Sequence, residues 1–261
     1  MARLIAMLAA LVALLNAPPL HAQGGPPFFT TDPGTPGNGN WEINVAAAAN
    51  RQSGTSAYQL PQLDVNLGVG ERVQLSAEIP YVRLSASGAP QQQGWSNALL
   101  GAKWRFLDQG EGGWQVATFP QLETAGSARA QRDGLASDGP RWLLPLEVAH
   151  RLGPLDVNLE AGYYLPRNGQ HERFVGLLAG GALNERLELD AELYTDRVSG
   201  LPTDAIADVG LRYQLQPAFI LLAMAGRSVN GSEPPHVRFT GYLGVQILLS
   251  DYGRHLMPAH H

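Results

Sequence analysis

The sequence predicts an all-β protein, a closed antiparallel transmembrane β-barrel of about twelve strands. Apolar and polar residues alternate along most of the chain, which is the period of a two-faced strand. The connections between these stretches are short and long in turn, as in membrane barrels. Glycine and proline account for 30 and 19 of the 261 residues and cysteine is absent. Many turns are therefore expected, and a disulfide scaffold or a cysteine-ligated metal site is excluded.

The first 22 residues have the pattern of a cleaved signal peptide. Arg3 precedes an apolar run from Leu4 to Leu15, and Ala22 offers a small residue at the expected cut. A membrane anchor is the alternative, but Pro18 ends the run well short of a bilayer span. We therefore expect export. The formal net charge is −5 and Lys103 is the single lysine, so a nucleic-acid partner is not expected.

Residues 23–40 separate the signal peptide from the first expected strand. The segment is rich in glycine and proline and contains Phe28 and Phe29. It either plugs the lumen of the barrel or simply leads into the first strand. Of these two interpretations we expect the leader.

Twelve stretches then alternate between apolar and polar residues. In one of them, Leu187 and Leu189 share a face while Glu188 and Asp190 share the other. A soluble secreted β-sandwich or barrel is the alternative, in which the apolar faces would form a packed core. The expected strands are 41–49, 59–69, 71–84, 95–107, 113–123, 140–151, 154–165, 172–183, 185–195, 204–215, 217–227 and 237–249.

Prolines weaken two of these strands. Pro120 falls within 113–123 and Pro145 within 140–151. Proline has no N–H to donate to a strand ladder and is normally confined to edges or bulges.

The connections favour a membrane barrel over a soluble one. Short turns are expected on the periplasmic side, which is also the side of both chain ends when the strand count is even. A tail, 250–261, follows the last strand in place of the aromatic C-terminal residue of many barrels. The short connections lie at 70–71, 108–112, 153–154, 184–185 and 216–217, and the long ones at 50–58, 85–94, 124–139, 166–171, 196–203 and 228–236.

Aromatic residues cluster near the expected strand ends. Such residues suit the two interfacial girdles of a membrane barrel. They are Trp41, Tyr81, Trp104, Phe106, Trp114, Trp142, Phe174, Tyr213 and Phe239.

Residues 27–82 resemble a family of bacterial outer-membrane proteins. The stretch Pro27–Asn44, including Thr30-Thr31-Asp32-Pro33-Gly34, is similar to the opening of the meta-pathway-of-phenol-degradation, or transporter-like, barrels. The hairpin Leu60–Tyr81 fits the same pattern. The family is similar in type to the barrel that secretes functional-amyloid subunits and to hydrophobic-compound uptake channels. The resemblance implies an outer-membrane pore of about twelve strands, without fixing a substrate.

The polar faces of the strands predict a charged lumen. Twelve tilted strands leave a bore of roughly 10 Å after side chains are counted. The charges either form a selectivity lining or hold the shape of the barrel through ion pairs. The candidates for the lumen lining are Glu42, Asp64, Glu78, Lys103, Arg105, Arg141, Glu147, Asp156, Glu160, Glu188, Asp190, Glu192, Asp208, Arg212 and Arg238.

Two relationships among these charges are expected. Asp156, Glu160, Glu188, Asp190 and Glu192 lie on two successive hairpins and would form one anionic wall. Glu42 on the first strand and Arg238 on the last would meet at the seam where the barrel closes.

No catalytic, cofactor-binding or metal-binding residues are assigned. His150 falls at a strand end, and His171 and His236 fall in loops, none with a serine in a recognisable spacing. The glycine-rich stretches lack the strand–loop–helix context of a phosphate loop. An enzyme is therefore not expected.

The predicted protein is an exported outer-membrane channel for passive passage of small, hydrophobic or aromatic, solutes. Its expected partners are outer-membrane lipid, the assembly machinery of that membrane and an unidentified small solute. The alternatives are a structural or secretion-linked barrel without its own substrate, and the soluble ligand-binding β-protein.

Overall fold

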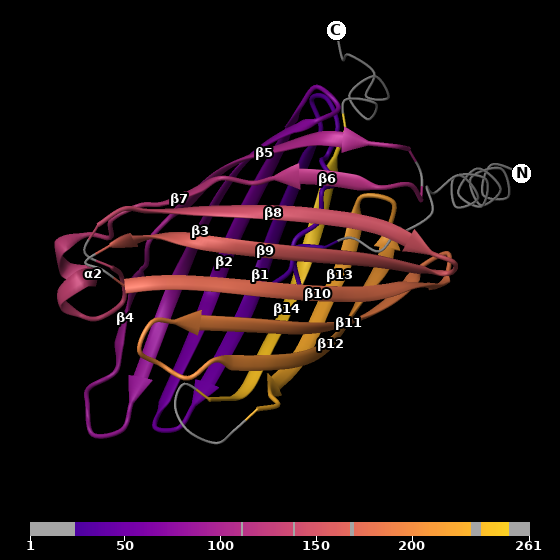
Figure 1. The fold of residues 1–261 in the computed structure, drawn as a ribbon. Coiled ribbons are helices and arrows are strands. Elements are labelled where there is room, and N and C mark those ends of the chain that lie inside the picture. Colours follow the sequence, from indigo (N-terminus) through magenta and orange to yellow (C-terminus); the bar gives the residue numbers. More distant parts are fainter. Residues whose placement is uncertain (1–23, 111, 138, 168–169, 231–235, 251–261) are drawn as a thin grey trace, which may run out of the picture.

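The computed structural model describes residues 24–110, 112–137, 139–167, 170–230 and 236–250. The expected signal peptide and residues 251–261 of the expected tail lie outside these ranges. Within them the chain is almost entirely β-structure wrapped into one cylinder (Figure 1). No helix of the described residues is long and apolar enough to cross a membrane.

In the described ranges, fourteen strands form a single closed antiparallel sheet. Short β4 and β5 together pair with β3, and β6 and β7 together fill the place between β5 and β8, so the ring has twelve strand positions. The elements are β1 (Trp41–Gln52), β2 (Thr55–Val69), β3 (Val73–Ala86), β4 (Gln92–Trp95), β5 (Leu99–Asp108), β6 (Gln115–Thr118), β7 (Gln121–Glu123), α2 (Ala128–Arg132), β8 (Arg141–Leu152), β9 (Leu155–Arg167), β10 (Gln170–Asn184), β11 (Leu187–Val198), β12 (Asp204–Gln216), β13 (Phe219–Ser228) and β14 (Val237–Leu249).

The barrel closes where β1 pairs with β14. Trp41 lies opposite Leu249, and the antiparallel register runs on to Arg51 opposite Phe239. Closure pairs the backbone groups of both edge strands, which a sheet in hydrocarbon requires. Glu42, near the start of β1, lies opposite Leu248. Arg238 of β14 lies instead beside Arg51 and Gln52, at the end of β1. The expected contact between Glu42 and Arg238 is therefore wrong, because antiparallel pairing places them at opposite ends of the seam.

The two faces of the sheet are inverted relative to a soluble protein. Leu193 on β11 is 46% exposed, whereas its neighbour Glu192 is 3% exposed. The same pattern holds on β9, where Leu159 is exposed and Glu160 is buried. A soluble sandwich would bury these leucines against a second sheet. The apolar residues instead cover the outside of a closed cylinder, which excludes the soluble alternative.

The two ends of the barrel differ in their connections. Five turns, after β2, β5, β8, β10 and β12, lie at the end where β1 begins and β14 ends, whereas α2 and the tight β1–β2 turn lie at the opposite end (Figure 1). The expected long loop at 50–58 is wrong, since β1 and β2 continue to Gln52 and Thr55. Residues 50–56 next to this turn are all polar or glycine, so the apolar–polar alternation disappears there although the strand pairing continues. The loop at 166–171 is likewise mostly strand.

The prolines have different effects in neighbouring strands. Pro120 separates β6 from β7, while Pro145 remains inside β8 opposite Gly162. The break is bridged because the Ala102 N–H donates to the Pro120 carbonyl at 3.1 Å and Thr118 Oγ1 donates to the Pro145 carbonyl at 2.9 Å.

Candidate functional site

The inner segment, residues 24–36, lies inside the barrel. It forms a tight loop in which the Gly25 N–H donates to the Thr30 carbonyl at 2.7 Å and the Phe28 N–H donates to the Gly25 carbonyl at 3.0 Å. At the tight-turn end, Thr35 Oγ1 donates to the Glu71 carbonyl at 2.9 Å. The chain thus enters the lumen, turns and returns to the rim before β1. It is not the simple leader that we expected.

Three glutamates of the barrel wall hold the turn of this segment. Glu192 accepts the N–H of Phe29 at 3.1 Å and that of Thr30 at 2.5 Å, through its two different oxygens. Glu160 accepts the Thr31 N–H at 2.7 Å, and Glu147 accepts the Thr31 hydroxyl. Hydrogen bonds to carboxylates are about twice as strong as neutral ones, so these glutamates bind the turn firmly.

Two cations of the wall hold the carbonyls of the same segment. Arg212 Nη2 donates to the Pro26 carbonyl at 2.6 Å, and Lys103 Nζ donates to the carbonyl of Asp32. Lys103 also pairs with Glu147 at 3.3 Å, with both side chains almost fully buried. Wall acids therefore bind donors of the inner segment, and wall bases bind its acceptors.

Glycines of the wall leave the space that the segment occupies. A Cβ atom on Gly176 would lie 2.0 Å from Thr30 Oγ1, and one on Gly210 would lie 2.6 Å from Phe28 Cζ. Near the rim, a Cβ on Gly68 would lie 1.8 Å from the carbonyl oxygen of Gly37. These approaches are far inside van der Waals contact, so each position requires glycine while the segment is in place.

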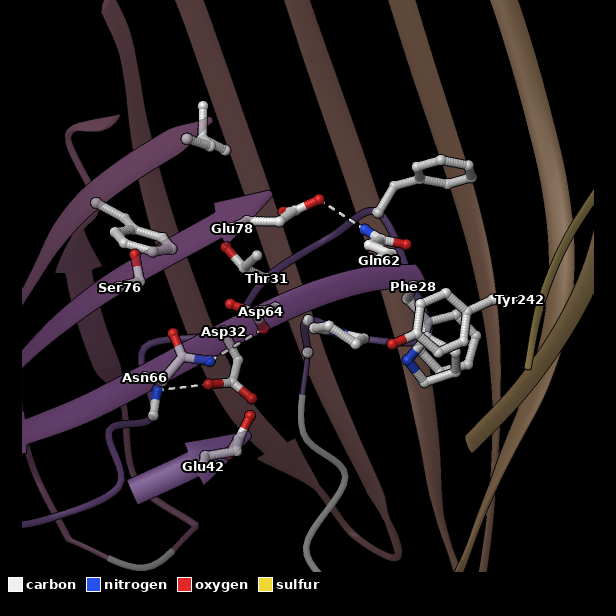
Figure 2. A pocket seen from close by; sticks show the side chains of 18 of the residues that line it. Phe28, Thr31, Asp32, Glu42, Gln62, Asp64, Asn66, Ser76, Glu78 and Tyr242 are labelled. Atoms are coloured by element: carbon white, nitrogen blue, oxygen red, sulfur yellow. Dashed lines mark hydrogen bonds between the residues drawn. The ribbon is translucent and has the colours of Figure 1, made fainter. Parts of the chain in front are cut away.

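A cavity of about 1260 Å³ remains between the inner segment and the wall. One side carries the half-buried carboxyl groups of Glu42, Asp64 and Glu78, and Phe28 and Tyr242 lie on the other (Figure 2). Further aromatic side chains line it, namely Phe29, Phe119, Tyr164, Phe174 and Tyr194.

Most of the predicted lumen residues fall into three groups. Lys103, Glu147, Glu160, Glu192 and Arg212 contact the inner segment, and Glu42, Asp64 and Glu78 line the cavity. Glu188, Asp190 and Asp208 are buried in the interior but do not line that cavity.

The remaining predicted residues lie near the two rims. Arg105 pairs with Asp108 at 3.2 Å, and Asp156 pairs with Arg151 at 2.8 Å, both towards the tight turns. Arg141 pairs with Glu123 and Glu172 towards the other end, where Arg238 is exposed and donates to Ser53. The expected anionic wall is therefore divided, because Asp156 is paired at the rim while Glu160 and Glu192 hold the inner segment.

The aromatic lining was missed at the sequence level. Phe174 was assigned to a lipid-facing girdle, but it is 5% exposed, stacks with Tyr194 at 5.5 Å and faces the lumen. Its position follows from parity, since Phe174 shares a strand face with Glu172 and Leu178 rather than with exposed Val175. The girdle prediction used only the position of Phe174 near a strand end, whereas the strand face that carries Phe174 decides that it points into the lumen.

The closed cylinder, its apolar exterior and its polar, occupied interior define a β-barrel of the outer-membrane type. No family model and no curated protein matches the chain. An outer-membrane channel from Pseudomonas putida F1 is similar to it, with a TM-score of 0.66 and 15% identity over 87% of this chain and 100% of that one. The KdgM porin follows with a TM-score of 0.55 and 15% identity, and the NanC porin with 0.57 and 9%, each over 78% of this chain and 98% of its own. At these identities the likeness concerns the fold.

Proposed function

We propose that this protein is an outer-membrane channel for passive passage of small solutes and that the inner segment is its plug. The observation that supports this proposal most directly is that residues 24–36 fill part of the lumen. They are held to the wall by hydrogen bonds and contacts with charged groups, with no covalent link across the lumen. Such contacts can exchange for water. The cavity beside the segment shows that the lumen is wider than its present filling.

The lining supports solutes with an aromatic or hydrophobic part. Phe29, Phe174 and Tyr194 form a connected group of rings, with centroids 5.1 Å apart for Phe29 and Tyr194. Flat apolar solutes gain stacking and burial against such rings.

A structural or secretion-linked barrel without its own substrate is the second candidate. The observation that favours it is the fit of the inner segment, which meets wall atoms at Gly176 and Gly210 and is bonded on both its donor and its acceptor sides. Under this interpretation the segment stays in place.

Conductance separates the two candidates. We would refold the chain from residue 23 in detergent, insert it into planar bilayers and compare it with a chain from which residues 24–36 are deleted. We expect small, intermittent conductance from the longer chain and larger, steadier steps from the deletion. If both give no conductance while both migrate in gels as heat-modifiable folded barrels, the channel is disproved and the structural barrel is favoured.

A further inference from the structure

One wall of the cavity carries three carboxylates, Glu42 on β1, Asp64 on β2 and Glu78 on β3. These residues, called here the carboxylate wall, all line the cavity. Adjacent strands bring them together, with Asp64 opposite Glu78 in the β2–β3 register and Asn44 opposite Asp64 in the β1–β2 register.

Neutral amides hold these carboxylates in place. Asn44 Nδ2 donates to Asp64 at 2.9 Å and to Glu42 at 3.2 Å. Asn66 donates to Asp64 at 3.0 Å, and Gln62 donates to Glu78 at 2.6 Å. Amide donors orient a carboxyl group without adding a cationic partner, so the three side chains of the wall are held in a fixed arrangement.

In the part of the chain that the structure describes, cationic side chains form no ion pair with this wall. Among the described residues, no salt bridge joins Glu42, Asp64 or Glu78 to a lysine, arginine or histidine. The residues that line the cavity include five carboxylates and a single ammonium group, that of Lys103. Lys103 is bonded to Glu147 and to the Asp32 carbonyl. Carboxyl groups therefore outnumber cationic groups on the lining of the cavity.

Aromatic surface lies across the cavity from these acids. Figure 2 shows the rings of Phe28 and Tyr242 on the side away from Glu78 and Asp64. Tyr242 is 9% exposed and lines the cavity, and its hydroxyl has no hydrogen-bond partner among the described residues. The hydroxyl is therefore available to hydrogen-bond a water or an acceptor group of a molecule in the cavity.

The arrangement favours an organic cation over a metal ion. No group of three or more aspartate, glutamate, histidine or cysteine side chains among the described residues converges closely enough to hold a metal. A hard cation such as Ca²⁺ needs six to eight oxygens at roughly 2.3–2.6 Å. An organic ammonium ion instead needs diffuse negative charge and an aromatic face. The size of the cavity also suits a molecule rather than an ion.

We propose that the cavity between the carboxylate wall and the rings of Phe28 and Tyr242 binds organic cations with an aromatic or hydrophobic body. The proposal rests on the proposed channel function and names its solute class as aromatic or aliphatic amines and quaternary ammonium compounds. Polyanions are excluded by the same charge. The KdgM porin, by contrast, has been described in complex with oligogalacturonate, which is a polyanion.

Calorimetry with matched probes tests this proposal. Phenyltrimethylammonium and benzenesulfonate carry opposite charges on similar rings, and each would be titrated into the refolded chain in detergent at fixed ionic strength. We expect the cation to bind at least roughly tenfold more tightly than the anion, because carboxylate attraction and the ring faces act together. Equal binding of the two probes, or tighter binding of the anion, would overturn the proposal.

Variants locate the binding to the carboxylate wall. The triple change Glu42→Gln, Asp64→Asn and Glu78→Gln is expected to weaken cation binding roughly tenfold, and Glu78→Gln alone roughly threefold. Glu185→Gln is the matched control, since Glu185 is exposed in the β10–β11 turn. If the triple variant does not fold, as judged by the loss of heat-modifiable migration in gels, cation binding by the Glu78→Gln variant tests the site instead. Equal weakening by Glu78→Gln and Glu185→Gln would disprove the site.

Bilayer currents keep this proposal distinct from the channel proposal. Calorimetric binding that depends on Glu78, in a protein that never conducts, supports the site and disproves the channel. Conductance without selective binding of phenyltrimethylammonium supports the channel and disproves the site.

Discussion

Glu192 Oε1 accepts the backbone N–H of Thr30 at 2.5 Å, which joins β11 to a residue 162 positions earlier in the chain. The other oxygen of the same carboxylate accepts the N–H of Phe29. A loop without strand partners must find other acceptors for its N–H groups. Inside this barrel, carboxylates that point into the lumen accept those hydrogen bonds. The acids on the polar faces therefore position the inner segment as well as line the interior.

Glu192→Gln should loosen the inner segment. Glutamine keeps one acceptor oxygen and places an NH₂ group against an N–H donor, so one charged hydrogen bond is lost and a donor–donor contact replaces it. The loss is about 2 kcal/mol, or roughly thirtyfold in the equilibrium between the docked and released segment. Single-channel recordings should show a larger open fraction than in the parent chain.

The control for this change is Glu185→Gln, which removes the same charge at an exposed turn. It should leave the open fraction unaltered. An unchanged open fraction in Glu192→Gln would show that these two hydrogen bonds do not restrain the segment.

A disulfide should lock the segment in place. An ideal Cβ atom on Gly176 would lie 3.1 Å from Thr30 Cβ, somewhat less than the roughly 3.5–4.5 Å of disulfides, and Thr30→Cys removes the hydroxyl oxygen that this Cβ would otherwise meet at 2.0 Å. The chain has no other cysteine, so Thr30→Cys with Gly176→Cys can form only one bond within a molecule. Oxidation should suppress conductance, and a reducing agent should restore it in the same bilayer. Each single-cysteine variant should respond to neither treatment, and suppression of current in them would refute the interpretation.

The sequence predicted the barrel but not what lies inside it. Strand alternation is a local pattern, so the lumen-facing side of β11 could be assigned from Glu188 and Asp190 and their apolar neighbours alone. The inner segment has no such period, and its partners on the wall, among them Glu160 and Glu192, lie more than a hundred residues away. The predicted Glu42–Arg238 contact failed for a related reason, since closure determines the register between the first and last strands.

The pair formed by Lys103 and Glu147 should contribute to stability as a unit. Both side chains are almost inaccessible, so removing one leaves the other charge buried without its partner. Lys103→Gln should lower the free energy of unfolding by roughly 3–5 kcal/mol, whereas Lys103→Gln with Glu147→Gln should cost less. Guanidinium unfolding in detergent, followed by tryptophan fluorescence, measures both. A double variant that loses the sum of the two single losses would show that the groups act independently.

The apolar exterior predicts that the cost of placing a charge on the outer face depends on its depth in the membrane. Leu193 is near the middle of β11 and Leu152 is the last residue of β8, at a tight turn, and both are highly exposed. In a bilayer, Leu193→Lys should cost roughly 2–4 kcal/mol, because the ammonium must leave water near the midplane, while Leu152→Lys should cost about 0–1 kcal/mol. Reversible unfolding in phospholipid vesicles measures the two losses under one condition. In water a lysine at either exposed position would be tolerated alike, so equal small losses would mean that hydrocarbon does not surround β11, and the membrane placement of the barrel would fail with it.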